Sequence, residues 1–159
     1  MKHLVLVRID DRLIHGQVVT AWVKQTDGNR IIIVDTPLTK DTFTQRILKA
    51  SAPSGIHVDV MATQSAIEEL KKEPEKGEKI IILVKTPEEI EALLLGGVLM
   101  EKVILGGMGS KAGRKKFNRN VSASPEEIAS LARINKMGIP IYFQLVPSQA
   151  PVDIRKLID

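Results

Sequence analysis

The chain has 159 residues, of which 43% are hydrophobic, and this size suits one substantial core and a single domain over residues 1–159. It contains no cysteine, which excludes disulfides and thiol catalysis and suits a reducing cytoplasm. Its net charge is only +4 and it has one Trp, one Tyr and three Phe, so a nucleic-acid partner is not expected. The three His residues lack the spacing of a metal site, and no metal is expected.

The first apolar run, Leu4-Val5-Leu6-Val7, predicts a buried strand. It is far too short for a signal peptide or a membrane span, so we expect a cytoplasmic protein. A helix should follow soon after, because Val18, Val19, Trp22 and Val23 are spaced to share one helical face.

Between this strand and this helix lies the stretch Arg8-Ile-Asp-Asp-Arg-Leu-Ile-His-Gly-Gln17. It reads as a loop that brings two Arg, two Asp and one His to a helix N-terminus. Free N–H groups and the positive end of the helix dipole favour phosphate at such a place. Arg8 and Arg12 can add forked, charge-assisted hydrogen bonds to the phosphate oxygens. The stretch therefore predicts an anion site.

Within this loop, His15 is the candidate that carries the phosphoryl group. Asp10 or Asp11 can fix the tautomer of its imidazole, or clamp an Arg, so that the free ring nitrogen faces the phosphorus. The competing interpretation is structural, since a loop His is usually a surface residue and an Asp–Arg pair is common in turns.

The residues from Arg8 to Val18 resemble the active-site segment of the IIB subunits of the mannose, fructose and sorbose family of the sugar phosphotransferase system. The resemblance implies that His15 accepts phosphate from a phosphohistidine on a IIA subunit. It further implies transfer to a sugar imported by the membrane IIC and IID subunits, through a covalent phosphohistidine and with no cofactor. The residues that would bind or orient the phosphate are Arg8, Asp10, Asp11, Arg12, Gly16 and Gln17.

The same resemblance implies a phosphotransferase subunit in the cytoplasm that associates peripherally with the membrane subunits. Mannose, fructose, sorbose and amino sugars all stay open as substrates. The ring nitrogen of His15 that is phosphorylated and the formation of a homodimer also stay open.

Further along the chain, apolar strands alternate with helical patterns. Strands are predicted at 30–34, 56–61, 79–84, 102–105 and 139–143, and helices at 41–51, 64–72, 86–95, 124–137 and after 151. In the helix at 41–51, Phe43, Ile47 and Leu48 fall on one apolar face. Such alternation predicts an α/β fold, with a mostly parallel sheet of about six strands and helices on both faces.

Ligands of such sheets bind beyond the carboxyl ends of the strands. Asp35 follows the second strand and is either a turn former or part of the site rim, whereas Asp41 suits a helix N-cap. Gly106, Gly107 and Met108 follow another strand, and we interpret them as a strand-end loop at the rim. The family's IIB members carry a similar Gly-Gly pair here.

The Gly cluster also raises the alternative of a nucleotide-binding module, but Gly106-x-x-Gly109 is not the dinucleotide fingerprint. A second alternative is a receiver-like signalling domain that holds magnesium with Asp10 and Asp11. That domain needs an acceptor Asp after the third strand, where this chain has Met61-Ala-Thr-Gln64.

A basic run extends from Lys111 to Arg119, in the long segment that leads to Ser122. It is either a solvated excursion or a docking surface for a negatively charged partner. Under the second interpretation, the basic rim that meets the IIA donor includes Lys111, Arg114 and Lys115 beside Arg8 and Arg12.

Overall fold

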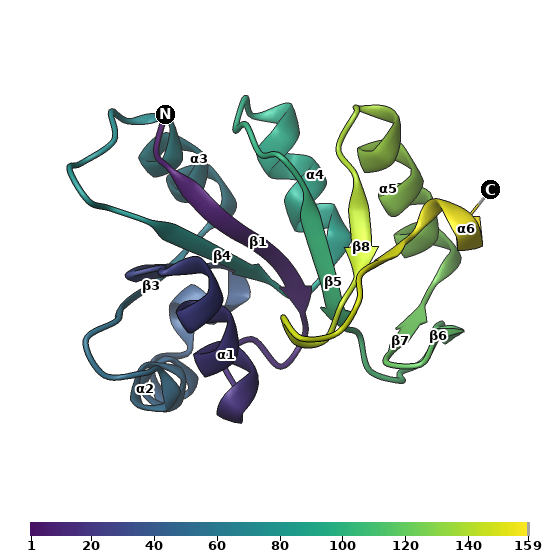
Figure 1. Ribbon diagram of the computed structural model, residues 1–159, viewed down its shortest axis with the longest axis horizontal. Helices are drawn as coiled ribbons and strands as arrows, with labels where there is room; N and C mark the ends of the chain where they lie inside the picture. Colours follow the sequence, from purple (N-terminus) through teal and green to yellow (C-terminus); the bar gives the residue numbers. More distant parts are fainter. Residues whose placement is uncertain (159) are drawn as a thin grey trace.

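The computed structural model describes residues 1–158, which build one seven-stranded sheet and a separate two-stranded hairpin (Figure 1). The strands are β1 (Leu4–Asp10), β2 (Arg30–Val34), β3 (His57–Met61), β4 (Ile80–Val84), β5 (Val103–Gly107), β6 (Lys115–Asn118), β7 (Val121–Ala123), β8 (Ile141–Phe143) and β9 (Val152–Asp153). The helices are α1 (Gly16–Thr26), α2 (Thr42–Ser51), α3 (Thr63–Lys71), α4 (Pro87–Leu95), α5 (Pro125–Lys136) and α6 (Arg155–Ile158), with a 3-10 turn η1 (Pro37–Lys40).

The strand order of the main sheet is β3-β2-β4-β1-β5-β8-β9, and every pairing is parallel except that of β8 with β9. The prediction of a mostly parallel α/β sheet is therefore confirmed. The sequence pattern missed the edge strand β9, because two residues are too few to show any alternation. No helix within residues 1–158 is long and apolar enough to cross a membrane.

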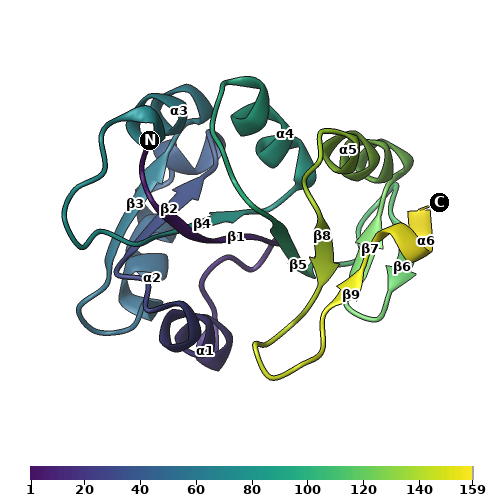
Figure 2. The ribbon, with the colours of Figure 1, turned by 45° about the horizontal axis from the view of Figure 1, so that its top comes forward.

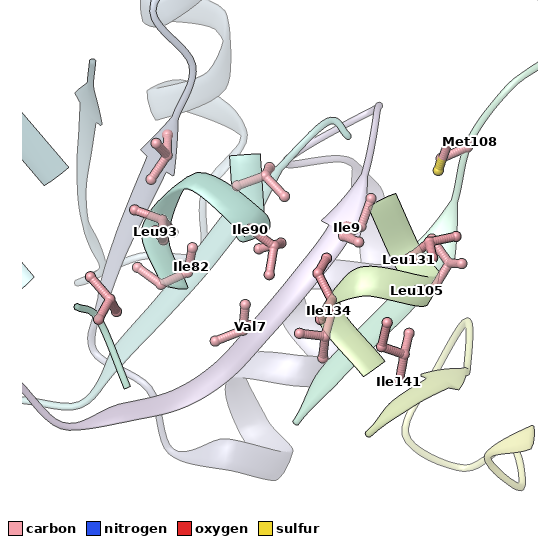
Figure 3. Packing of buried hydrophobic residues seen from close by; sticks show 14 of the residues in the cluster. Val7, Ile9, Ile82, Ile90, Leu93, Leu105, Met108, Leu131, Ile134 and Ile141 are labelled. Atoms are coloured by element: carbon pink, nitrogen blue, oxygen red, sulfur yellow. The ribbon is translucent and has the colours of Figure 1, made fainter. Parts of the chain in front are cut away.

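Helices cover both faces of the sheet (Figure 2). On one face α1 and α2 pack over a core that includes Val19, Trp22 and Leu48. On the other face α3, α4 and α5 cover a larger core, part of which Figure 3 shows around Ile9, Ile90 and Leu131. All five residues of β4 are buried, because this strand lies between two neighbours and under helices on both faces.

The position of β1 in the sheet determines where a site can form. β1 continues into α1 on one face, whereas its neighbours β4 and β5 lead to α4 and α5 on the other face. Loops that leave adjacent parallel strands toward opposite faces open a crevice at the carboxyl edge of the sheet. The segment that follows β1 lies at this crevice.

The predicted apolar face of α2 was partly wrong. Leu48 is buried, but Phe43 and Ile47 are largely exposed. The helix begins after Asp41, whose carboxylate accepts a hydrogen bond from the Thr44 backbone N–H at 3.0 Å, as an N-cap does. From this start, only Leu48 among the three faces the sheet.

The segment between β5 and α5 is not a plain loop. Its residues pair as the antiparallel hairpin β6–β7, and Met108 forms an isolated bridge to Val121. Val121 and Ala123 are buried against the core on the α5 side of the sheet. The hairpin therefore packs as part of the fold, although most side chains of β6 are polar.

Candidate functional site

β1 extends through Asp10, three residues beyond the predicted end at Val7. Arg8 and Asp10 are thus strand residues, and the prediction that both lie in the loop was wrong. They alternate with Val7 and Ile9, so their side chains point to the α1 face of the sheet. Arg8 and Asp10 are both completely buried there, which is possible because they pair with each other at 3.2 Å.

Arg8 is enclosed by contacts from three other parts of the chain. Its Nη1 donates a hydrogen bond to the Gln144 carbonyl at 2.9 Å, and its guanidinium stacks 5.4 Å from the centroid of the Trp22 ring. The Trp22 indole N–H in turn donates to the Leu145 carbonyl at 3.0 Å. A Cβ on Gly106 would lie 2.2 Å from the Arg8 Cζ, so only glycine fits beside this guanidinium. Arg8 therefore holds the Asp10 carboxylate from the interior of the protein, and its guanidinium is not free to reach a ligand in solvent.

Asp10 contacts both Arg residues of the site and His15. Its Oδ1 accepts hydrogen bonds from the Arg12 backbone N–H at 3.1 Å and from Arg12 Nε at 3.2 Å. Its Oδ2 faces Arg8 Nη2 at 3.2 Å, Arg12 Nη2 at 3.3 Å and His15 Nε2 at 3.4 Å. Burial alone raises the pKa of Asp10, but the hydrogen bonds from Arg12 and the charges of both Arg outweigh it and hold that pKa below its ordinary value. Asp10 is therefore a carboxylate at neutral pH.

His15 is the N-cap residue of α1, and its side chain is 27% exposed. Because Nε2 faces the Asp10 carboxylate, the proton of a neutral ring belongs on Nε2 and the lone pair on Nδ1. The first turn of α1 contains no acidic residue, and the His15 side chain makes no capping hydrogen bond to its N–H groups. A basic ring nitrogen thus lies beside the positive end of a helix.

The turn that brings His15 to this place is held by apolar contacts. Leu13 and Ile14 are buried in the core under α1, and Leu13 adopts a left-handed conformation with φ of 57°. Gly16 also has a positive φ of 47°, which glycine adopts without strain. Gly16 and Gln17 are both exposed at the start of α1. The loop itself is therefore short and anchored on both sides of Asp11 and Arg12.

Of the two Arg in the predicted anion site, only Arg12 is half-exposed. Its guanidinium is oriented by Asp10 and still has N–H groups that face solvent. Asp11 does not contact the imidazole; its carboxylate instead accepts from the Gly109 N–H at 2.7 Å and from Arg114 Nη1 at 3.3 Å. Of the two candidate carboxylates, Asp10 is therefore the one in contact with the His15 ring.

Gly106 and Gly107 are the last two residues of β5 and not a strand-end loop as predicted. Both do approach the site: a Cβ on Gly107 would lie 3.3 Å from Arg12 Nη2 and from Asp10 Oδ1. Met108, predicted at the rim, is buried in the core (Figure 3). Because the Arg8 guanidinium fills the space beside Gly106, no room is left there for a nucleotide phosphate.

Asp35 belongs to a neighbouring cluster. Its Oδ1 accepts from the Leu38 N–H at 3.0 Å and so caps η1, and its Oδ2 lies 3.5 Å from Lys85 Nζ. The structure thus gives it the turn-forming role, and no contact joins it to His15 among the described residues. Lys85 follows β4 directly, next to β1 in the sheet, and is a cation at this edge that sequence reasoning missed.

Arg114 corrects the prediction of a basic docking rim. Its side chain is only 2% exposed, and it makes two hydrogen bonds to the Glu127 carboxylate, at 2.8 and 2.7 Å. Lys111, Lys115 and Lys116 are exposed as expected. The burial of the Arg114 side chain was missed because its partner lies in the next helix and several other cations surround it in the sequence.

The donor set does not fit a magnesium site of the receiver type. Both oxygens of Asp10 are occupied by Arg, and Asp11 is paired with Arg114. Within residues 1–158, no three His, Asp or Glu side chains are grouped so that they could hold a metal ion.

Comparison with known proteins assigns the chain to a family. The family model for the PTS system sorbose subfamily IIB component matches residues 4–159. The sorbose-specific EIIB component of Lacticaseibacillus casei is 34% identical over 98% of this chain and 95% of its own length. The mannose-specific EIIAB component of Escherichia coli is also 34% identical, over 96% of this chain, which spans only 47% of that longer protein.

Solved structures agree with the sequence matches. The IIBSor domain of the sorbose permease from Klebsiella pneumoniae superposes with a TM-score of 0.93, at 31% identity over 98% of this chain and 96% of that domain. Together with the family model, this similarity over nearly the full length shows that the chain belongs to the sorbose-type IIB components of the sugar phosphotransferase system.

Proposed function

We propose that His15 is the phosphoryl carrier of this IIB component, receiving the group from a phosphohistidine on a IIA subunit and delivering it to a sugar at the membrane IIC and IID subunits. The observation that carries this proposal is the contact between His15 Nε2 and the buried Asp10 carboxylate, which leaves the lone pair of Nδ1 free as a nucleophile on the N-cap residue of α1. The names of the relatives, among them a domain of a sorbose permease, support the partner classes.

The transfer is balanced without a cofactor. The Nδ1 lone pair of His15 forms the new N–P bond while the N–P bond of the donor breaks, and that electron pair returns to the donor imidazole. The Nε2 proton stays between the ring and Asp10 throughout. Arg12 and the N–H groups of the first turn of α1 stabilise the charge on the phosphoryl oxygens. In the second transfer His15 is the donor. The sugar hydroxyl oxygen forms a bond to phosphorus while the N–P bond breaks, and that electron pair returns to Nδ1. The hydroxyl proton leaves to solvent or to a base on the membrane subunits.

The direct test uses radiolabelled phosphoenolpyruvate, the general phosphotransfer proteins and a IIA subunit from the sorbose or mannose systems. We expect one label per chain that is labile in acid and stable in base, and an NMR spectrum that assigns it to Nδ1 of His15. Label with the stability of an acyl phosphate would contradict the proposal, and so would label on His3 or His57.

Arg12→Lys tests the role of the exposed guanidinium. Lysine keeps the charge but loses the fork, and a charge-assisted hydrogen bond contributes about 1.5–3 kcal/mol, so single-turnover transfer should slow by roughly 10- to 100-fold. The matched control is Arg46→Lys on the exposed side of α2, which should transfer at the wild-type rate. Unchanged kinetics in Arg12→Lys would mean that Arg12 only shapes the loop.

We further propose that exposed cations beside the site steer the encounter with a IIA donor that presents a phosphate. The segment after Gly109, whose N–H donates to Asp11, carries three exposed lysines: Lys111, Lys115 and Lys116. The Arg114 side chain on this segment is buried, so it is not one of the steering cations. Charged groups in solvent are screened over about 8 Å at physiological salt. Association should therefore depend on ionic strength, while transfer within a preformed complex should not.

Reversal of these three charges to Glu should lower the association rate at low salt by about tenfold, as measured by stopped-flow mixing with the phosphorylated donor. The control reverses Lys71, Lys72 and Lys76, which are also exposed but lie near the C-terminal end of α3, and changes the net charge by the same amount. Equal association rates in the two triple variants would show that these three lysines do not steer the encounter.

A further inference from the structure

Asp11 joins the loop between Asp10 and His15, here called the active loop, to the segment after β5 through several hydrogen bonds. Its backbone N–H donates to the Gly107 carbonyl at 3.1 Å. Its carboxylate Oδ2 accepts from the Gly109 N–H at 2.7 Å and from Arg114 Nη1 at 3.3 Å. Arg114 Nη1 also donates to the Gly109 carbonyl at 2.9 Å, so a single guanidinium nitrogen binds both sides of this junction.

Arg114 is itself fixed from behind. The two hydrogen bonds to Glu127 are parallel and bidentate, and the Glu127 side chain is almost fully buried. Glu127 Oε1 also accepts from the Ser124 N–H at 2.9 Å, and Ser124 Oγ accepts from the Glu127 N–H at 3.1 Å, which completes the capping box of α5. The orientation of Arg114 is therefore set by the start of a helix.

This chain of contacts leads from α5 to the residue next to Arg12. Asp11 is 28% exposed in its side chain, unlike Arg114, and its carboxylate has no contact with His15 among the described residues. The contacts therefore do not orient the imidazole. They determine instead where the loop between Asp10 and His15 lies relative to the segment 107–114.

We propose that Arg114 is a positioning residue, which acts through Asp11 and Gly109 to hold the active loop in the geometry that transfers phosphate. This inference rests on the proposed function for its effect on transfer, but not for the contacts themselves. It replaces the role in docking that the basic sequence around Arg114 indicated.

Asp11→Ala is the principal variant, because it removes the junction and leaves the buried Arg114–Glu127 pair intact. Hydrogen exchange of the Gly109 amide in the unphosphorylated protein should accelerate about tenfold, as expected when a charge-assisted hydrogen bond is lost. Single-turnover transfer from the phosphorylated donor should slow about tenfold, while the donor concentration at half-saturation stays unchanged. Asp11→Asn, which keeps an acceptor for the Gly109 N–H, should recover part of both effects.

The matched control is Asp41→Ala, since Asp41 also accepts from a backbone N–H at the same edge of the sheet, at Thr44 in α2. There the Thr44 amide should exchange faster, with the Gly109 amide and the transfer rate unchanged. Arg114→Lys, which keeps a charge opposite Glu127 but loses the fork, should reproduce the slower transfer of Asp11→Ala.

The outcomes separate this inference from the proposed function. If Asp11→Ala leaves both Gly109 exchange and transfer at wild-type values, or speeds exchange without slowing transfer, the positioning role is overturned. If the wild-type protein takes no label on His15, the proposed function fails and the role in transfer fails with it, whatever the exchange shows.

Discussion

Replacement of His15 by alanine is expected to abolish phosphoryl labelling of this IIB component. The variant lacks the proposed nucleophile, and no other group of the site is placed to replace it, because Asp10 is buried among Arg and Asp11 is paired with Arg114. Labelling with phosphoenolpyruvate and a IIA donor should fall to background. The free energy of unfolding of the His15→Ala variant should differ from that of the wild type by less than about 0.5 kcal/mol, since the imidazole is partly exposed and adds little to the core.

The two other His residues provide the controls for this loss. His3 is exposed at the start of β1, and His57 is exposed at the start of β3, where it pairs with Asp59 at 3.0 Å. Both lie at the amino edge of the sheet, opposite the crevice. His3→Ala and His57→Ala should take label as the wild type does. Label lost from His57→Ala and retained in His15→Ala would show that the site has been assigned to the wrong edge.

Gly106→Ala should produce a large loss of stability from a single methyl group. The new Cβ would lie 2.1 Å from Arg8 Nη2 and 2.2 Å from its Cζ, and the guanidinium cannot withdraw because Trp22, Asp10 and the Gln144 carbonyl surround it. Overpacking at so confined a place costs about 3 kcal/mol, which urea unfolding would measure. Transfer should also fall, since Arg8 supports Asp10.

A double-mutant cycle identifies the cause of this loss. In an Arg8→Ala background the added methyl group has room, so Gly106→Ala should then cost less than about 1 kcal/mol. Gly109→Ala is the matched control, because its Cβ would meet nothing closer than Asp11 Oδ2 at 3.4 Å. An equal cost of Gly106→Ala in both backgrounds would show that Arg8 is not the obstacle.

The sequence predicted the fold more completely than the site. The apolar runs at 31–34 and 80–84 are recognisable as buried strands because their residues are buried between two helical layers. The end of β1 was placed too early because the polar residues Arg8 and Asp10 do not look like residues of a buried strand. A buried Arg and a buried Asp are tolerated at this point only because Gly106, Trp22 and Gln144 enclose them, and those residues are far apart in the sequence.

The same reasoning explains the error at Arg114. In the sequence it is one of several cations in a polar run, and nothing local separates it from Lys111 or Lys115. Its burial depends on Glu127, which the sequence presents only as an acidic residue in the first turn of a helix. The sequence left Asp10 and Asp11 as equal candidates for the partner of His15, and only the three-dimensional arrangement distinguishes them.

The contacts of Arg8 and Trp22 with the carbonyls of Gln144 and Leu145 also determine when the site can be assembled during synthesis. β1 is made before its sheet partners: about half of the 159 residues precede the end of β4, β5 follows later, and the segment after β8 comes near the end of the domain. A nascent chain that ends before Gln144 lacks one of the contacts that hold Arg8 against Asp10, so the surroundings of His15 are completed late. β1 therefore has both of its neighbours in the sheet only after β5 has been made, and separations of this length along the chain make such pairing slow.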